Sequence, residues 1–332
     1  MSASLICAID GENVDFALDS GAAYTRLESV RRFKTGDFPT FTDALQGYTR
    51  ELQLSTAGLP LGLAVAGVTG GDVVTLANCR WYISVSGLKS FLANPPVLIN
   101  DFSAIAWSLA GVDVGRLKRI GMLPPKATSP GRRFVVVGTG SGLGMATLIM
   151  GEGGIIHVVP GEGGHTSFAP QNAFEDEMLA RLRTRLGHVS FERLLAASGL
   201  QNIYGVAAEA RGRKEPPPTA EAIVASALRG DVLATQAVEA FISVLGSFAG
   251  NMVLCTGGFD GVFLVSPLIE AMLPLIERNG FRAAFLNKGR MKKALETVPV
   301  SFSPDNNARL YGAAAALRAR QIAAEREVRS AA

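Results

Sequence analysis

A coarse unit occurs twice along this chain, and it constrains the fold more than any other feature. Two short strands joined by a glycine-containing turn are followed by another strand and by helices, once near the start and again from Phe134. SLICAI and VDFALDS, joined at DGEN, predict the first strand pair, and FVVVGTGSGLGMATLIM predicts the second. The pattern predicts two α/β lobes with a cleft between them, a smaller lobe over 1–110 and a larger one over 111–310. A closing helix near 311–325 is expected to pack back on the smaller lobe.

Other stretches complete this outline. RLESVRRF predicts a third strand, residues 40–53 a helix, and LGLAVAG with DVVTLAN a second pair of strands. VLIN predicts a buried strand that leads into the helix DFSAIAWSLAG, and GIIHVV and GVFLVS predict two later strands. From Phe174 to about Leu254 the pattern is helical, with KEPPPTA at 214–220 as an exposed connector. Strands and helices therefore alternate in both predicted lobes.

Composition narrows the class of partner. The 332 residues carry a net charge of only +3, without a concentrated basic tract, which argues against nucleic acid. The three cysteines are far apart and include no C-x-x-C pair, so neither a disulfide framework nor a thiolate zinc site is indicated. The start lacks the features of a signal peptide, and no uncharged apolar run approaches the roughly 18 residues that a membrane span needs. We expect a soluble cytoplasmic protein.

Asn100 ends the strand VLIN, and Asp101 begins the helix that follows it. They would therefore lie at the carboxyl end of a sheet strand, where α/β proteins build sites. Asp101 is consistent with two interpretations. It could cap the helix through the free backbone N–H groups, or it could accept a hydroxyl proton, since the same field would keep it ionised.

The stretch GTGSGLG, residues 138–144, follows a strand and contains four glycines. Its backbone amides could approach an anion closely, or it could be a hairpin turn without a ligand. The dinucleotide fingerprint fails, because its third glycine would fall on Leu143 and because MATLIM continues as a strand. This failure argues against a nicotinamide dehydrogenase.

PGEGGHTSF, residues 160–168, places Glu162 and His165 among glycines. Glycines allow close backbone packing against a ligand, while a carboxylate and an imidazole can hydrogen-bond neighbouring hydroxyls. Metal binding is a weaker option because no H-x-x-H or cysteine partner is present. Glu192, in the first turn of a further helix, could bind a ligand or belong to a simple cap with Ser190.

Several ordered motifs together closely resemble the bacterial glucokinase family, within the actin-like ATPase superfamily of sugar kinases. The resemblance covers nearly the whole chain, and its motifs are listed in chain order. They are NCRWYIS at 78–84, LINDFSAIAW at 98–107, GTGSGLG at 138–144, PGEGGHTSFAP at 160–170, GHVSFERLLAASGLQNIY at 187–204, GSFAGN at 246–251 and NGFRAAFLNKGRMK at 279–292.

The resemblance implies a two-lobed actin-like (ribonuclease H-like) fold and an ATP-dependent glucokinase. Asp101 would accept the proton of the glucose 6-hydroxyl, and ATP would enter with Mg²⁺. A homodimer is also implied. T-S-F-A-P follows His165 where related proteins carry a cysteine-rich zinc motif, so no metal held by the protein alone is predicted. The implied glucose ligands are Asn100, Glu162, His165 and Glu192, and the implied nucleotide-binding residues are Asp10, Gly11, Gly138, Thr139, Gly140, Ser141 and Gly142.

Two stretches depart from the family pattern. Where the family has D-x-G-G-T-N, this chain has AIDGEN, so the family aspartate falls on Ala8 without a gap or on Asp10 with a two-residue deletion. Glu12 replaces the threonine hydroxyl in either alignment. Where the family has a glycine pair near adenosine, this chain has Ser266 and Pro267. The alternative function is thus a catalytically weak or inactive glucokinase-like protein that binds sugar in a regulatory role.

Overall fold

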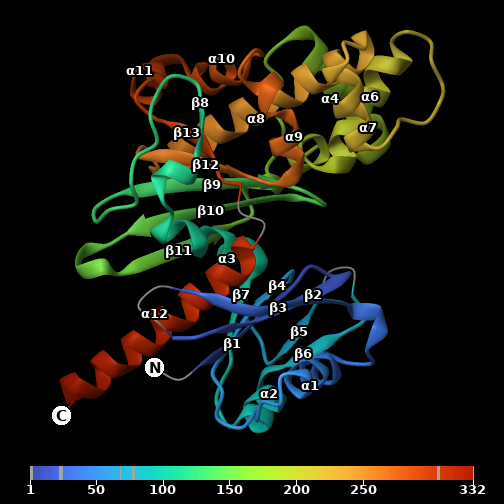
Figure 1. The fold of residues 1–332 in the computed structure, drawn as a ribbon. Helices are drawn as coiled ribbons and strands as arrows, with labels where there is room; N and C mark the ends of the chain where they lie inside the picture. The colour runs from blue at the N-terminus through green and yellow to red at the C-terminus, as the bar shows by residue number, and fades with distance from the viewer. Residues whose placement is uncertain (1–2, 22–24, 68, 77–78, 305–306, 332) are drawn as a thin grey trace. The chain divides into compact units, whose positions relative to one another are not determined.

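The computed structural model describes residues 3–21, 25–67, 69–76, 79–304 and 307–331. These residues form two compact units, which are treated separately (Figure 1). The first unit comprises residues 1–112, 151–160 and 305–332, and the second comprises 113–150 and 161–304. Six short 3₁₀ helices connect longer elements in the described part: Thr35–Asp37, Leu109–Gly111, Val114–Arg116, Glu152–Gly154, Gly163–His165 and Gly289–Met291.

The sheet of the first unit has five strands in the order β3-β2-β1-β4-β7. Their bounds are β1 (Ser4–Ile9), β2 (Asn13–Asp19), β3 (Leu27–Lys34), β4 (Leu61–Val65) and β7 (Val97–Asn100). β1 and β2 form the antiparallel hairpin predicted from the sequence, and β4 is parallel to both β1 and β7.

The predicted pairing of the strands at 61–67 and 72–78 is wrong. β4 lies inside the main sheet, whereas β5 (Val73–Thr75) pairs with β6 (Tyr82–Ser84) in a separate two-stranded sheet. Every residue of β4 is buried, as is typical of a parallel strand covered on both faces, while β5 buries only its central residue. The last two residues of the 72–78 stretch lie outside the described residues.

Alternate residues of β1 face two different helical layers, as the two-residue period of a strand requires. Leu5, Cys7 and Ile9 pack in one core with α1 (Phe41–Glu51) and α2 (Val85–Leu92). Ile6 and Ala8 pack in another core with α3 (Asp101–Ser108) and α12 (Ala308–Ala331). Both faces of this sheet are therefore covered by helices.

α12 approaches its neighbours closely because small residues line the contact. A Cβ at Gly62 of β4 would lie 2.7 Å from the carbonyl oxygen of Ala313, and a Cβ at Gly312 would overlap the backbone of Ala104 in α3. Figure 1 shows α3 and α12 side by side. The contact fixes the first turns of both helices against each other.

The second unit contains β8 (Lys118–Ile120), β9 (Arg133–Thr139), β10 (Leu143–Met150), β12 (Gly261–Val265) and β13 (Val300–Phe302). With β11 (Ile156–Gly161), these strands form a sheet in the order β11-β10-β9-β12-β13-β8. β9 and β10 form the predicted antiparallel hairpin, and β12 adds in parallel to β9.

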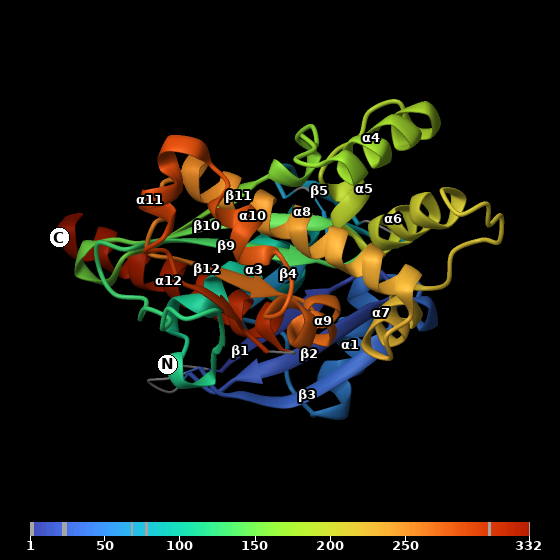
Figure 2. The same cartoon turned by 90° about the horizontal axis from the view of Figure 1, so that it is seen from above.

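Eight helices of the second unit follow in the described residues: α4 (Ala173–Leu186), α5 (Glu192–Leu195), α6 (Ala197–Glu209), α7 (Ala220–Leu228), α8 (Val232–Thr256), α9 (Pro267–Ile276), α10 (Phe281–Leu286) and α11 (Lys292–Leu295). α8 packs against α6, α7 and α10 (Figure 2). The motifs at 246–251 and 279–292 contact each other here, since a Cβ at Gly246 of α8 would overlap the carbonyl of Phe281 in α10. Both stretches thus serve close helix packing.

The expectation that no apolar run reaches membrane-spanning length is wrong for α8. This helix has 25 residues and a mean hydropathy of 1.6 over its most apolar window. However, 67% of that window is buried inside the protein, with Phe241 and Phe248 at 0% exposure. α8 is therefore apolar because it forms the core of the second unit.

The Gly312 contact predicts an unusual effect of a helical glycine-to-alanine change. Gly312→Ala should lower the melting temperature, because overpacking costs about 1–3 kcal/mol while the gain in helix propensity is only about 1 kcal/mol. Gly205 of α6 is the matched control, because a Cβ there would meet nothing within 4 Å. Gly205→Ala should stabilise the protein or leave it unchanged, as measured by circular dichroism. Equal melting temperatures for the two variants would contradict this packing.

Candidate active site

Asn100 ends β7 and caps α3. Its Oδ1 accepts hydrogen bonds from the backbone N–H of Phe102 at 2.9 Å and of Ser103 at 3.2 Å, and its Nδ2 donates to the carbonyl of Gly67 at 3.4 Å. The capping role considered for Asp101 therefore belongs to the preceding residue. Both ends of the Asn100 amide are used within the protein.

Asp101 is the first residue of α3 and is half-buried. Its Oδ1 accepts a hydrogen bond from the Phe102 N–H at 2.9 Å. Burial raises the pKa of Asp101 above its ordinary value; the positive charge of Arg309 and the Phe102 hydrogen bond oppose that rise, and the charge of Asp10 adds to it. Desolvation is thus a larger effect on this pKa than the charges and hydrogen bonds around the carboxyl. A raised pKa makes the carboxylate a stronger proton acceptor.

The turn between β1 and β2 contains Asp10, not Ala8. Ala8 is buried within β1, whereas the Asp10 Oδ1 accepts a hydrogen bond from the Asn13 N–H at 2.8 Å. Gly11 has φ 101°, a backbone conformation that favours glycine. The Glu12 side chain is exposed. The backbone carbonyl of Glu12 accepts hydrogen bonds from the backbone N–H and the hydroxyl of Thr35. The hydroxyl of Thr35 thus stabilises this turn by a hydrogen bond.

The stretch 138–144 is a hairpin turn, as its spacing predicts. Thr139 pairs with Leu143 across the hairpin, and the Gly140 N–H donates to the Gly142 carbonyl at 2.8 Å. Because β10 follows where a dinucleotide fingerprint needs a helix, the structure agrees with the rejection of that fingerprint.

Glu162, His165 and Glu192 lie together in the second unit. His165 Nε2 is 3.7 Å from an oxygen of Glu162, and its Nδ1 is 3.8 Å from Glu192 Oε1. The side chain of Glu162 is 87% exposed, that of His165 62% and that of Glu192 28%. These groups form a hydrogen-bonding surface that a polyhydroxylated ligand could reach.

Glycines allow this loop to lie against the hairpin. A Cβ at Gly164 would overlap the carbonyl oxygen of Leu143, and a Cβ at Gly163 would lie 2.8 Å from the sulfur of Met252. Only residues without a side chain fit these contacts. The backbone on both sides of Gly163 and Gly164 is therefore held, although the side chains of Glu162 and His165 are exposed.

Glu192 also contacts the glycine hairpin. Its Oε2 accepts a hydrogen bond from the Leu143 N–H at 3.1 Å and would lie 2.7 Å from a Cβ at Gly142. The alternative of a simple cap with Ser190 is wrong, since α5 begins at Glu192 without a side-chain capping hydrogen bond. Within the second unit, the structure joins three predicted sugar ligands to the predicted phosphate turn.

The first unit holds the remaining predicted residues: Asp10, Gly11, Asn100 and Asp101. Sequence reasoning missed Arg309 of α12, whose Nη2 lies 3.6 Å from Asp10 Oδ2. No local pattern could identify it, because its partner is nearly the whole chain length away. Among the described residues, no group of three or more His, Cys, Asp or Glu side chains is placed to hold a metal ion. Asn78, the first residue of the motif at 78–84, lies outside the described residues.

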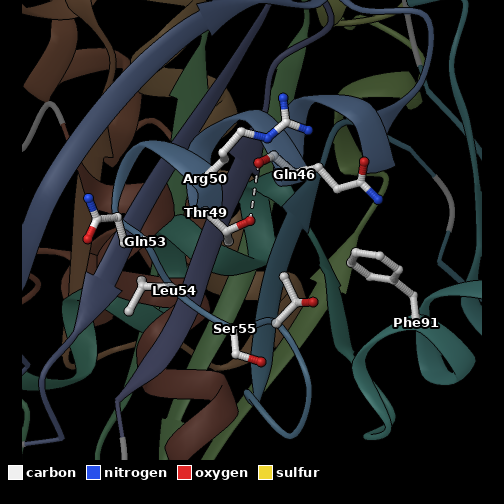
Figure 3. Close-up of a pocket in the computed structure, with 8 residues that line it drawn as sticks. Gln46, Thr49, Arg50, Gln53, Leu54, Ser55 and Phe91 are labelled. Atoms are coloured by element: carbon white, nitrogen blue, oxygen red, sulfur yellow. Dashed lines mark hydrogen bonds between the residues drawn. The ribbon is translucent and has the colours of Figure 1, made fainter.

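Two cavities of the first unit lie away from the predicted site residues. The larger, of about 540 Å³, lies between the end of α1 and Phe91 of α2, with Gln46, Arg50 and Gln53 on its wall (Figure 3). A smaller one of about 210 Å³ is lined by Trp81 and Tyr82. The residues that line the two cavities include none of the predicted site residues.

Comparison with known proteins identifies the family. The glucokinase family model matches residues 5–320 of the chain. The chain belongs to the glucokinase family. A glucokinase from Stenotrophomonas maltophilia strain K279a is 35% identical over 317 residues, covering 94% of this chain and 93% of that protein.

Two further comparisons define the extent of the likeness. A protein of Burkholderia orbicola strain AU 1054, named bifunctional protein glk, is 35% identical over 298 residues. The match covers 89% of this chain, but the chain spans only 45% of that relative's length. The crystal structure of a glucokinase from an Antarctic psychrotroph has a TM-score of 0.85 at 28% identity, covering 96% of this chain and 99% of that one. The chain therefore has the actin-like ATPase fold of glucokinases.

Ser266 occupies one of the two positions where the sequence departs from the family glycine pair. Its φ of 149° and ψ of 153° belong to a region that is nearly restricted to glycine. Its hydroxyl accepts a hydrogen bond from the Ile269 N–H at 3.1 Å and lies 3.0 Å from the Thr139 hydroxyl. Pro267 is the first residue of α9, as expected for a proline at a helix start.

This geometry predicts that Ser266→Gly is more stable than Ser266→Ala. Both variants lose the cap, which costs about 1 kcal/mol, but glycine also relieves backbone strain of about 1–3 kcal/mol. Chemical denaturation of both variants would measure the difference. A Ser266→Ala variant as stable as Ser266→Gly would show that the backbone here is not strained.

Proposed function

We propose that this chain is an ATP-dependent glucokinase that transfers the γ-phosphoryl group to the 6-hydroxyl of glucose. Family membership and the match to a glucokinase over 94% of the chain support this activity. The observation that carries the proposal is the cluster of Glu162, His165 and Glu192 against the hairpin at 138–144. It joins a surface for hydroxyl groups to a turn whose backbone amides suit phosphate.

In this proposal Asp101 accepts the proton of the 6-hydroxyl as the oxygen attacks phosphorus. Phosphoryl transfer has a loose transition state, so the protein mainly aligns the two reactants and balances charge. Glu162, His165 and Glu192 would bind the other hydroxyls of glucose. A site that hydrogen-bonds each hydroxyl discriminates strongly against analogues that lack one. Asn100 would contribute mainly by fixing the start of α3, because its amide is already bonded within the protein.

The two compact units would correspond to the two lobes of the kinase, with α12 in the smaller one. The proposed nucleotide site comprises Asp10, Gly11, Gly138, Thr139, Gly140, Ser141 and Gly142. Mg²⁺ bound to ATP would neutralise phosphate charge while keeping several waters. We further propose a cytoplasmic homodimer, in line with the soluble substrates and with the implied family assembly.

A second function, a sugar-binding relative with weak or no catalysis, is favoured by one observation. The exposed carboxylate of Glu12 lies in the turn where the family has a threonine. A negative charge near phosphate would weaken ATP binding. The experiment that follows distinguishes the two functions.

Asp101→Asn should abolish phosphoryl transfer while glucose still binds. Loss of a general base reduces rates by about 10²- to 10⁴-fold, whereas the asparagine retains similar shape and hydrogen-bonding capacity. Formation of glucose 6-phosphate from glucose and Mg-ATP gives the rate, and calorimetry gives glucose affinity. Asp176→Asn, at an exposed aspartate of α4, is the matched control.

The outcomes separate the functions. Product from the wild-type protein but not from Asp101→Asn supports the glucokinase. Glucose binding without product, whether ATP, another nucleotide or polyphosphate is supplied, supports the sugar-binding relative. If glucose does not bind, neither function holds.

Gly142→Ala should weaken glucose binding by about 10- to 150-fold. The added methyl group would collide with Glu192 Oε2 and displace its carboxylate, and loss of a hydrogen bond with a charged group costs about 1.5–3 kcal/mol. Gly140→Ala provides the comparison in the same turn, because a Cβ there meets nothing within 4 Å. It should change the Kd for glucose, measured by calorimetry without nucleotide, by less than about twofold. Similar Kd values for both variants would argue against Glu192 as a sugar ligand.

A further inference from the structure

Arg309 lies where helix electrostatics disfavour a cation. It is the second residue of α12, which begins at Ala308, and the N-terminus of a helix carries partial positive charge. A nearby negative charge must offset this unfavourable position. The carboxylate of Asp10 lies close to Arg309, with an Nη2–Oδ2 distance of 3.6 Å.

Arg309 and Asp101 also lie at the same end of the sheet, because Asp10 follows β1, Asp101 follows β7, and both strands are parallel to β4. Gly312 lies against Ala104, so closely that a Cβ on Gly312 would overlap the Ala104 carbonyl. Arg309 precedes Gly312 by about one helical turn, and Asp101 precedes Ala104 by the same interval. The first turns of the two helices therefore carry a guanidinium and a carboxylate in the same region of the first unit.

Two carboxylates and the Arg309 guanidinium thus lie in this region, and the guanidinium of Arg32 in β3 also acts on Asp10. Asp10 comes from the turn after β1, Asp101 from α3 and Arg309 from α12. The Arg309 and Asp10 side chains are only 31% and 26% exposed, so solvent screens their charges less than at an open surface. Removal of Arg309 would take away the positive charge that acts on both carboxylates.

We propose that Arg309 is a positioning residue for Asp101, whose charge it balances so that Asp101 stays available as a base. The inference rests on the proposed phosphoryl transfer, in which Asp101 accepts the hydroxyl proton. The pKa of Asp101 agrees with it in direction: burial and Asp10 raise that pKa, while Arg309 lowers it. Arg309 would therefore keep Asp101 ionised at a lower pH than burial alone would allow.

A purely structural role for Arg309 predicts a different result. If Arg309 only anchors the turn at Asp10 to α12, its loss would reduce stability and the maximal rate. It would not move the pH at which Asp101 takes up a proton. The position of that titration therefore distinguishes the two roles.

The experiment titrates the Asp101 carboxyl directly. The full chain is labelled with ¹³C at aspartate carboxyl carbons, and the Asp101 resonance is assigned by its absence in Asp101→Asn. Arg309→Gln should move the titration midpoint upward, because an attractive charge is lost. Asp10→Asn should move it downward, because a repulsive charge is lost. Arg309→Lys keeps the charge and should restore most of the wild-type behaviour.

The matched control is Arg320→Gln, which removes the same charge from an exposed position on the same helix. Arg320 lies about three turns further along α12, roughly 16 Å from Arg309, beyond the screening length of physiological salt. It should leave the midpoint unchanged. A midpoint in Arg309→Gln equal to that in Arg320→Gln would overturn the proposal. If Arg309→Gln fails to fold, Arg309→Met, which also removes the charge and keeps an unbranched side chain, is titrated in its place with the same expected upward shift.

Kinetics gives a second readout if the protein phosphorylates glucose. The acidic limb of kcat/KM should move to higher pH in Arg309→Gln, because activity is lost as the pH falls through the pKa of the base. At the pH where the wild-type enzyme has half its maximal kcat/KM, we expect a loss of about 3- to 10-fold, with the plateau changed by less than about twofold. An unchanged limb with a lower plateau would indicate the structural role. Because carboxyl titration needs no turnover, failure of the proposed function and failure of this inference remain distinguishable.

Discussion

The close approach of α12 to α3 is the contact on which the chemistry of the first unit depends. Gly312 brings the backbones of the two helices together at Ala104, and Gly62 of β4 admits α12 to the sheet in the same way. A strand ending at Asn100 and a helix capped by its side chain fix the direction of Asp101. Asp101 is therefore positioned by contacts that are almost entirely apolar or made by the backbone. Gly62 and Gly312 are far from Asp101 in sequence, yet they are as necessary for its position as its neighbours in sequence are.

In the second unit, a single carboxylate links the two stretches that the proposed reaction needs. Glu192 lies between His165 and the Leu143 N–H, so one of its oxygens contacts the loop at 160–168 while the other contacts the glycine hairpin. A shift of the hairpin would displace Glu192, and a ligand that draws Glu192 toward it would act on the hairpin. Glycines at 142, 163 and 164 make this arrangement possible, since a Cβ at any of them would collide with a neighbour. Coupling between sugar binding and phosphate binding could begin at this contact.

The sequence predicted what depends on local pattern and missed what depends on distant contacts. Both hairpins, the strand at 97–100 and the long helical stretch carry their own periodicity and turn residues, and the structure contains them. The expectation that the strand at 97–100 is buried is wrong, because all four of its residues are partly exposed. The partner of the strand at 61–67 was wrong because pairing is decided by burial on both faces, which a hairpin pattern does not reveal. Capping was one of the two interpretations of Asp101 because both Asn and Asp are good caps, and only coordinates distinguish adjacent residues. Arg309 was missed because no pattern of neighbouring residues relates position 309 to position 10.

The two departures from the family pattern affect backbone and charge differently. Ser266 accepts a conformation suited to glycine and still caps α9, so the helix start survives at the cost of strain. Gly11 retains positive φ in the first turn, and Thr35 supplies a hydroxyl to it from another segment. The shape of these turns is therefore maintained by means other than the family residues. What differs from the family pattern is charge, because Glu12 adds an exposed carboxylate to the turn in which the Arg309 guanidinium lies beside Asp10. The charge of Glu12 lies on the turn after β1, and the opposite charge of Arg309 lies beside that turn at the start of α12. Their effects on a bound polyphosphate would therefore partly cancel. Substitution at these positions should therefore alter nucleotide affinity and its dependence on salt more than it alters the fold.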